Sequence, residues 1–379
     1  MKADAGCRYR LYPTLHQAER LAELDWLADL PAQSAQQILG HLDRAFDDWW
    51  NPEHPGGTPQ FKKRSQTMSV PFPGQAVAVR KLSRRWAQVW LPKLGWVRYR
   101  LSRPLGGALR NATASRDALG WHVSFGVATG AGPAAPSELP GCGVDFGVAC
   151  SAFVSTETEP RLMPATLSEG ERRRLLGLER RKARQLRSAK KHHQGRYSRR
   201  LRRTITEIAK LKARQARRRA DFTHKLTTDL AKSHGWVGIE DLRVKCMTSS
   251  ARGTALVHGG NVRAKAGLNR SILDNTPGER RRQLAYKVVR FGSELRLVPP
   301  VGTSQTCSAC GVRDPGSRPG CGRVFACSAC GLQMHADRNA AKNIEALAAG
   351  WAVDSTRSHL LVARPVRSRM REPLVGASA

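Results

Sequence analysis

The sequence predicts an α/β plus β protein, and three observations support this fold class. Between residues 86 and 127, apolar and polar residues alternate with period two and turn signals recur about every ten residues, which is typical of a small barrel or sandwich. After the Gly- and Pro-rich segment 130–141, strand patterns alternate with helix patterns, as in an α/β domain. Two Cys-x-x-Cys pairs between residues 307 and 330 indicate a small metal-binding module.

The N-terminal region combines one strand pattern with two helix patterns. Residues 7–12 (CRYRLY) alternate as a strand, and Pro13 and Thr14 end that strand and begin a helix. The second helix ends before Asn51-Pro52. The apolar stripes that define the two helices are Ala18, Leu21 and Leu24, and then Ile38, Leu42 and Phe46.

Tryptophans mark the strand patterns that follow. Four of them stand at alternating positions, which places each on a defined face of its strand: Trp86, Trp90, Trp96 and Trp121. We expect most of them to pack in a core, with stacking on nucleic-acid bases as the alternative.

The charge of the chain indicates a polyanionic partner. The 379 residues include 64 Lys or Arg and 30 Asp or Glu, a formal charge of +34. Acidic small molecules do not require so large an excess, whereas nucleic acid does, because each neutralised phosphate releases a counterion. Hydrophobic residues make up 40% of the chain, which excludes wholesale disorder. No apolar run of 18 residues and no apolar N-terminal run occur, so we expect a cytoplasmic protein without a membrane span.

More than half of the excess charge lies in residues 171–219. This segment has 21 Lys or Arg and three acids, a net charge of +18. An apolar stripe formed by Leu201, Ile205, Ile208 and Leu211 follows helical spacing, and HHQG at 192–195 separates it from a weaker stripe. We interpret the segment as an antiparallel helical hairpin. A merely solvated helix pair would carry mixed charge, so the excess of Arg favours phosphate contacts.

The four paired cysteines have the spacing of a structural zinc site. Cys307 and Cys310 form the first pair, and Cys327 and Cys330 form the second after 16 intervening residues. A closed four-thiolate site of this kind stabilises a fold and leaves no position open for catalysis.

Three acids occupy positions where an unpaired carboxylate is costly. Asp145 follows an apolar strand in GVDFG, Glu240 ends a buried strand pattern in GWVGIE, and Asp337 stands where a helix begins in HADRN. Pairing with Lys or Arg is one explanation for each acid taken alone. If the three carboxylates meet, they bind two divalent cations of the kind that hydrolyse phosphodiesters. Their spacing alone leaves both explanations open.

Several motifs, in their order along the chain, resemble the TnpB (OrfB) family of insertion-sequence RNA-guided nucleases, which is related to the type V CRISPR effectors. They are GVDFG, GIEDLRVKCM, TSQTCSACG, FACSACG and HADRNAAKNI, preceded by RLYPT, PAQSAQQILGHLDRAF and GTPQFKKR. The resemblance extends over nearly the whole chain to about residue 350. One helix after RLYPT is missing relative to the family pattern, so the resemblance implies a shortened recognition part.

The resemblance implies an RNase H-like (RuvC) nuclease domain with an inserted zinc ribbon and an N-terminal wedge-type β-barrel. The expected domains are the barrel (1–12 and 56–130), a short helical recognition insertion (13–55), a linker (131–140), the nuclease domain (141–302 and 332–350) with the basic hairpin 171–219, the zinc ribbon (303–331) and a disordered tail (351–379).

The activity that the resemblance implies is RNA-guided DNA cleavage. The resemblance also implies a bacterial or archaeal protein that associates with the nucleoid. By motif match, Asp145, Glu240 and Asp337 are the catalytic acids and bind two magnesium ions, and the four cysteines bind zinc. A non-coding guide RNA is the cofactor, double-stranded DNA is the target, and a transposase or recombinase encoded by the element is the functional associate. Arg338 or Asn339 is expected to orient Asp337 or to touch the scissile phosphate, with a helix-start role for Asn339 as the alternative.

The nucleic-acid contacts are expected on the basic hairpin and on one basic strand of the barrel. The candidates are Arg172, Arg173, Arg174, Arg180, Arg181, Lys182, Arg184, Arg187, Lys190, Lys191, Arg196, Arg199, Arg200, Arg202 and Arg203 on the hairpin, and Arg98 and Arg100 on the strand.

Three alternative functions remain at this stage. The same scaffold without cleavage would be an RNA-guided DNA-binding regulator, which the complete set of acids argues against. A transposase or transposase accessory protein would use the same acids for strand transfer. A zinc-ribbon transcription factor would leave GVDFG and GIEDL without a role.

Overall fold

The computed structural model describes residues 4–23, 32–52, 57–59, 68–130, 132, 134–192, 194–254, 257–319 and 322–350. These residues form two compact units, one within residues 4–129 and the other within 130–350. The predicted disordered tail (351–379) and the point at which the recognition part is predicted to be shortened (24–31) lie outside the described residues.

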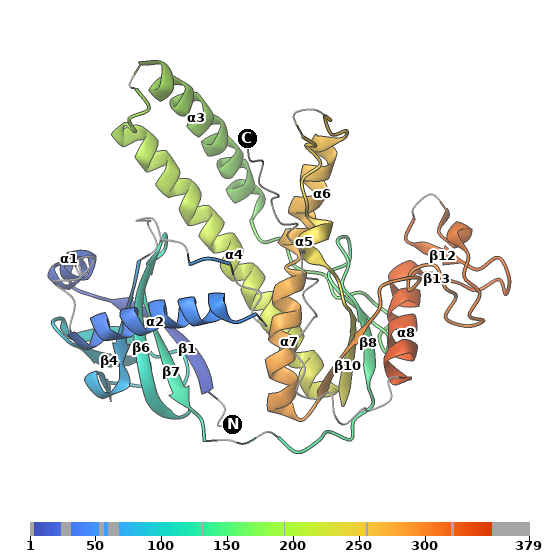
Figure 1. The fold of residues 1–379 in the computed structure, drawn as a ribbon, viewed down its shortest axis with the longest axis horizontal. Helices are drawn as coiled ribbons and strands as arrows, with labels where there is room; N and C mark the ends of the chain where they lie inside the picture. Colours follow the sequence, from blue (N-terminus) through green and yellow to red (C-terminus); the bar gives the residue numbers. More distant parts are fainter. Residues whose placement is uncertain are drawn as a thin grey trace, which may run out of the picture. The chain divides into compact units, whose positions relative to one another are not determined.

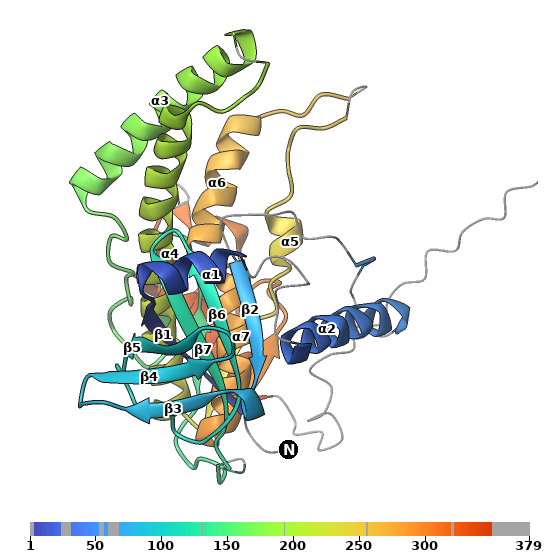
Figure 2. The same cartoon turned by 90° about the vertical axis from the view of Figure 1, so that its left-hand side faces the viewer.

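The first unit is built on a seven-stranded antiparallel sheet with the order β2-β6-β7-β1-β5-β4-β3. Figure 2 shows strands β3, β4 and β5 in front. The strands are β1 (Asp4–Tyr12), β2 (Met68–Pro73), β3 (Ala78–Lys81), β4 (Trp86–Leu91), β5 (Gly95–Arg100), β6 (Ala108–Asp117) and β7 (Gly120–Ala128), with a 3-10 turn (Gly74–Ala76) between β2 and β3. Strands β2 and β3 are the two edges in this order, so closure into a barrel stays a prediction.

Strict alternation along the strands separates core from surface in this unit. In β4, Ala87, Val89 and Leu91 are buried, whereas Trp90 on the opposite face is 42% exposed. The expectation that most of the tryptophans pack in the core is therefore wrong, since Trp121 alone of the four is buried. Arginines on the outer face explain the difference: Arg80 lies 4.3 Å from the Trp96 ring centre, and Arg98 and Arg100 lie over Trp86.

Two helices accompany this sheet. Helix α1 (Leu15–Glu23) begins with a capping box in which Thr14 and Gln17 exchange hydrogen bonds, and it buries Leu21 in the core. Helix α2 (Ala32–Trp50) packs on β2. Of its predicted stripe only Ile38 packs against the core, and Leu42 is 47% exposed.

The second unit contains a four-stranded sheet with the order β11-β10-β8-β9. Its strands are β8 (Cys142–Asp145), β9 (Phe153–Val154), β10 (Trp236–Glu240) and β11 (Glu294–Val298). Strand β10 runs parallel to β8 and to β11, and β9 returns antiparallel to β8. The predicted α/β plus β class is confirmed for the described residues.

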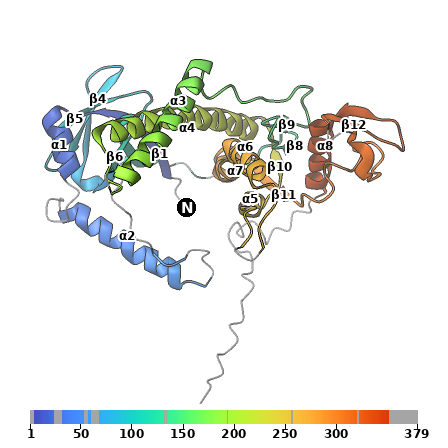
Figure 3. The ribbon, with the colours of Figure 1, turned by 90° about the horizontal axis from the view of Figure 1, so that it is seen from above.

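Helices cover both faces of this sheet (Figures 1 and 3). Helices α4 (Arg199–Ser233) and α7 (Pro277–Phe291) pack on one face around Leu230 and Leu284. Helix α8 (Ala336–Ala349) covers the other face. Gly143 is required there, because a Cβ on it would lie 2.2 Å from the Ala341 carbonyl oxygen. The remaining helices of this unit are α3 (Glu169–His192), α5 (Val244–Met247) and α6 (Val262–Asp274).

Helices α3 and α4 form the predicted antiparallel hairpin. Leu178, Ile208 and Leu211 are buried between the two helices, and Leu175 packs beside them. Gln194 and Gly195 in the turn have positive φ angles, and Ser198 caps α4 through the Leu201 N–H group. Helix α4 continues beyond the predicted hairpin to Ser233, so one helix joins the basic segment to the sheet.

The cysteine-rich segment is a small module on two short antiparallel strands, β12 (Val324–Ala326) and β13 (Gln333–His335). A 3-10 turn (Pro315–Ser317) precedes β12. Phe325 forms its core with Cys307, Cys327 and Ala336. No helix in the described part of the chain has the length and apolar character needed to cross a membrane.

Candidate active site, metal centre and nucleic-acid surface

The ends of two parallel strands bring two of the predicted acids together. Asp145 is the last residue of β8, and Glu240 is the last residue of β10. Val144 pairs with Ile239 in the register of these strands, so the two acids that follow are neighbours at the carboxyl edge of the sheet.

The third acid reaches the same edge from helix α8. Gly143 and Gly238 both face α8 closely, and alternation by two places Asp145 and Glu240 on this same face. Asp337 lies in the first turn of α8. Its carboxylate lies 3.9 Å from the position of a Cβ built on Gly147, just after Asp145. The structure therefore brings together all three acids singled out in the sequence.

The electrostatics of the cluster are those of crowded carboxylates. Burial, and then the nearby Glu240 and Asp337, together raise the pKa of Asp145 to about 7, while Arg318 opposes them. Burial also raises the pKa of Glu240, against a hydrogen bond of 2.5 Å from the Thr303 hydroxyl. Among the described residues, no Lys or Arg lies within 4 Å of Asp145 or Glu240. Simple pairing with a basic side chain therefore does not explain these two acids.

A Cys–His pair lies beside Asp337. The Sγ atom of Cys150 is 4.0 Å from Nε2 of His335, and both groups are close enough to Asp337 to share an ion with it. However, Nδ1 of His335 accepts the Asp337 N–H group at 3.2 Å. The neutral imidazole then carries its proton on Nε2, so that atom is not a free metal ligand. His335 instead fixes the start of α8 and, with it, the backbone of Asp337.

The four predicted zinc ligands converge. The sulfurs of Cys307 and Cys330 are 3.7 Å apart, and those of Cys310 and Cys327 are 3.6 Å apart. A tetrahedral ion with Zn–S bonds of about 2.3 Å requires sulfurs separated by about 3.8 Å. The cluster therefore has the donor set and the size of a structural zinc site.

Asn339, Asn343 and Thr303 connect the cysteine-rich segment to the acids, and Thr303 does so through its hydrogen bond to Glu240. Sequence reasoning missed Asn343 and Thr303 and misread Asn339. Asn339 is fully buried; it accepts the Ser308 N–H group and donates to the Thr306 carbonyl oxygen. Asn343 donates to the Thr303 and Thr306 carbonyl oxygens. The structure shows no direct contact of Asn339 with Asp337: the buried amide of Asn339 is bonded to the backbone of the cysteine-rich segment instead. The sequence signal was the N-x-x-x-N spacing on one helix face.

A buried arginine supports the loop behind Asp145. Arg280 on α7 is fully buried, donates to the Ser151 carbonyl oxygen and lies 5.1 Å from the centre of the Phe146 ring. Burial lowers its pKa to about 10. No pattern in the sequence distinguishes Arg280 from the arginines beside it.

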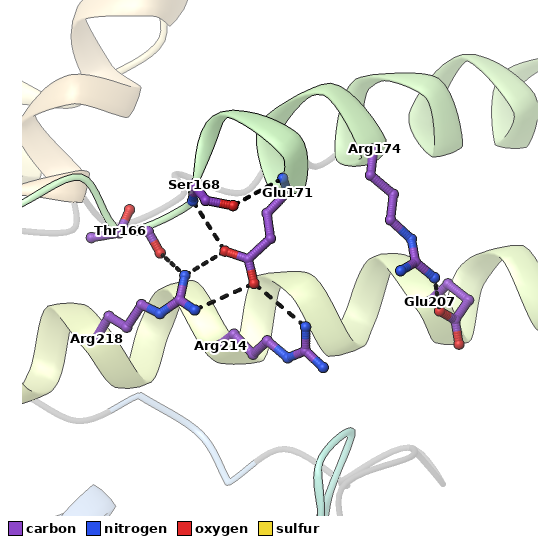
Figure 4. Close-up of polar contacts among 7 residues, drawn as sticks. All are labelled: Thr166, Ser168, Glu171, Arg174, Glu207, Arg214 and Arg218. Carbon is purple, nitrogen blue, oxygen red and sulfur yellow. Dashed lines mark hydrogen bonds and ion pairs between the residues drawn. The ribbon is translucent and has the colours of Figure 1, made fainter.

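At the base of the basic hairpin, where α3 begins, the carboxylates form ion pairs with arginines of the facing helix (Figure 4). Glu171 accepts the Ser168 N–H group and lies 2.5 Å from Arg218 and 3.4 Å from Arg214 on the facing helix. Arg174 pairs with Glu207 at 2.7 Å across the same hairpin. These contacts lower the pKa of Glu171 to about 2, chiefly through Arg218.

The distal part of the hairpin carries cations without acid partners. In the described part of the chain, no carboxylate lies within 4 Å of Arg180, Arg181, Lys182, Arg184, Arg187, Lys190, Lys191, Arg196, Arg199, Arg200, Arg202 or Arg203. By contrast, the predicted contacts Arg172 and Arg173 pair with Glu169. The cations without acid partners are thus concentrated between Arg180 and Arg203.

Two family models match this chain. One is described as "Cas12f1-like, TNB domain" and matches residues 278–344, and the OrfB model, described as "Probable transposase", matches residues 130–251.

Two relatives match over most of this chain. The chain is 35% identical over 373 residues to "Putative RNA-guided DNA endonuclease InsQ" of Escherichia coli (strain K12), covering 97% of this chain and 88% of the relative. It is 29% identical over 369 residues to "Putative RNA-guided DNA endonuclease" of Streptomyces pristinaespiralis, covering 95% and 83%.

Among solved structures, the chain resembles that of a Cas12f1–sgRNA–target DNA complex. The TM-score is 0.41 at 16% identity, over 74% of this chain and 59% of the solved chain. A structure of CasPhi-2 (Cas12j) bound to crRNA gives a TM-score of 0.36 at 13% identity, over 78% and 65%.

Proposed function

This chain belongs to the TnpB (OrfB) family, and from that membership and the geometry of the acids we propose that it is a metal-dependent, RNA-guided DNA endonuclease. The guide RNA pairs with double-stranded DNA beside a short flanking motif. The unit within residues 130–350 is the RuvC-like nuclease domain, and the unit within 4–129 is the wedge-type barrel with its recognition helices.

The observation that carries this proposal is the convergence of Asp145, Glu240 and Asp337. Two acids end adjacent parallel strands, and the third begins the helix that covers the same face. Burial and the nearby Glu240 and Asp337 raise the pKa of Asp145, and neither Asp145 nor Glu240 has a basic partner within 4 Å among the described residues. Such a site has a strong affinity for cations in place of protons.

The donor set fits two magnesium ions, which prefer carboxylate oxygens. When bound, such ions lower the pKa of the attacking water and neutralise the leaving oxygen of the phosphodiester. The Thr303 hydroxyl holds one oxygen of Glu240, which leaves the other oxygen for the ions. His335 fixes the helix start that presents Asp337.

The ribbon and the hairpin complete the proposed assignment. Zinc at Cys307, Cys310, Cys327 and Cys330 holds the ribbon, whose backbone is tied to α8 through Asn339. The unpaired cations between Arg180 and Arg203 hold the guide RNA or its duplex with DNA, and Arg98 and Arg100 hold RNA from the wedge-type unit. An element-encoded transposase or recombinase is the functional associate.

The test is to sequence RNA that co-purifies with the expressed chain and to offer a plasmid that matches its guide segment. We expect a discrete RNA, and cleavage that requires both the match and magnesium. Matched binding without cleavage would instead identify a guided DNA-binding regulator. Joined DNA products that need no guide would identify a strand-transfer enzyme.

A further inference from the structure

A cavity opens on the sheet of the first unit, away from every residue assigned above. It has a volume of about 410 Å³ and lies between the end of β3 and the segment that follows β5. Small-molecule sites commonly occupy this size range and the mouths of β-barrels. Its walls include Ala87 and Leu101, and its rim carries the cations Lys81, Arg84 and Arg103.

Tyr99 is one of the residues that line this cavity. Tyr99 is fully buried, and its hydroxyl makes no hydrogen bond in the described part of the chain. The neighbouring phenol of Tyr9, in contrast, is satisfied by the Arg103 carbonyl oxygen at 3.1 Å. A buried hydroxyl left unpaired is unfavourable, so its position indicates a ligand that completes its hydrogen bonding.

The wall of the cavity is fixed before any ligand arrives. The Tyr9 hydroxyl donates to the Arg103 carbonyl oxygen, and the Cys7 thiol contacts the Leu105 carbonyl oxygen at 3.8 Å. These contacts hold segment 103–105, which contains Arg103, from the core side. Lys81 is the last residue of β3, and Arg84 lies in the turn between β3 and β4. Within the described ranges, no carboxylate lies within 4 Å of Lys81, Arg84 or Arg103.

We propose that this cavity binds one unpaired nucleotide, with the base beside Tyr99 and the phosphate at the rim formed by Lys81, Arg84 and Arg103. Apolar walls suit the faces of a base, a neutral hydroxyl pairs with its edge, and three unpaired cations suit phosphate. An acyl chain would leave the hydroxyl unsatisfied. The assignment rests on the proposed function only for the source of the nucleotide, which is a bulged position of the guide RNA. A free mononucleotide has the same chemistry and is tested separately.

Two experiments on the full chain test this assignment. The complex as purified with its RNA is irradiated at short wavelength, digested and searched by mass spectrometry for nucleotide adducts. We expect an adduct on the peptide that contains Tyr99 and segment 103–105. Separately, RNA-free chain is titrated with AMP by equilibrium dialysis to detect the free mononucleotide.

Matched variants make the result specific. Arg84→Ala should lower adduct yield and AMP affinity about tenfold, whereas Arg85→Ala, its exposed neighbour of equal charge that does not line the cavity, should change neither. Tyr99→Phe should weaken AMP binding about fivefold and leave the melting temperature unchanged or raised, since the hydroxyl is unpaired without ligand.

The outcomes separate this inference from the proposed function. RNA that crosslinks only elsewhere, together with equal AMP binding by wild type and Arg84→Ala, would overturn the cavity assignment and leave guided cleavage untouched. AMP binding that depends on Arg84, without an RNA adduct, supports the nucleotide site and assigns it to free nucleotide. Absence of bound RNA and of cleavage in the wild type would refute the proposed function whatever the AMP titration shows.

Discussion

Two carboxylate clusters of the same unit, the sheet edge around Asp145 and the hairpin base around Glu171, have opposite electrostatics. Neighbouring acids and burial raise the pKa of Asp145 to about 7, whereas two arginines and a backbone N–H group lower that of Glu171 to about 2. The hairpin acids pair with arginines of the facing helix, whereas Asp145 and Glu240 at the sheet edge have no Lys or Arg within 4 Å among the described residues. In a chain of charge +34, acids that escape pairing mark the place where an added cation is required.

Apart from the loss of a catalytic acid, the largest effect is expected when the ribbon that supports the sheet edge is unfolded. Cys307→Ser removes one of four thiolates, and because zinc binding is coupled to ribbon folding, the chain should lose its zinc. Cleavage should fall at least about 100-fold, since Thr303 and Asn339 lose their partners. Zinc content by elemental analysis and plasmid cleavage are measured together. Cys321→Ser is the control, because Cys321 belongs to neither Cys-x-x-Cys pair. Normal cleavage by a zinc-free Cys307→Ser chain would refute the coupling between zinc binding and cleavage.

A smaller effect is expected when one anchor of the ribbon is removed. Asn339→Ala leaves the partly buried Ser308 N–H group without its partner, which costs about 1–3 kcal/mol, and removes one of the two donors to the Thr306 carbonyl oxygen. We expect a lower melting temperature and cleavage reduced about tenfold. Ser328→Ala removes only an exposed hydrogen bond to Asp314 and serves as the control. Equal cleavage by both variants would show that Asn339 does not position the acids.

The hairpin side of the comparison is tested by salt dependence. Replacing Arg184 and Arg187 with Ala should lower RNA affinity about three- to tenfold and reduce the log–log salt slope by about two. Replacing Arg172 and Arg173, which pair with Glu169, should have less effect. The measurement is RNA binding by fluorescence anisotropy over a range of salt concentrations. An equal loss of RNA affinity in both double variants would mean that pairing with Glu169 does not reduce the contribution of Arg172 and Arg173 to RNA binding.

The smallest effect is expected from the hairpin carboxylate itself. Because the folded-state pKa of Glu171 lies below its usual value of 4.5, its stabilisation is complete above about pH 4.5 and is lost as the pH falls towards 2. Asp145 has the opposite sign: its raised pKa makes the metal-free chain less stable as the pH rises from about 4 to 7.

Melting curves of metal-free chain across pH check both signs. Glu171→Gln should lower the melting temperature at neutral pH and flatten the acid limb. Asp145→Asn should flatten the limb between about pH 4 and 7. Identical pH profiles for wild type and both variants would contradict the comparison.

Much of the site was predictable from local pattern, and the remainder depends on pairing between distant segments. The positions of Asp145 and Glu240 at strand ends followed from apolar runs, but their meeting depends on the Val144–Ile239 register across nearly a hundred residues. Such long-range pairing leaves no local signal. The orientation of the outward-facing tryptophans was mispredicted because alternation identifies two faces of a strand without saying which one is buried. The contact of Arg80 with the Trp96 ring stabilises the outward position of that side chain.

Guided plasmid cleavage by wild type, Asp145→Asn and Glu171→Gln in parallel tests the central claim most directly. With co-purified RNA, a matched plasmid and magnesium, wild type and Glu171→Gln should cut. Asp145→Asn should bind RNA and target normally and cut on the order of 1,000-fold more slowly. Cleavage by Asp145→Asn at the wild-type rate would contradict the assignment of the three acids as the catalytic metal site.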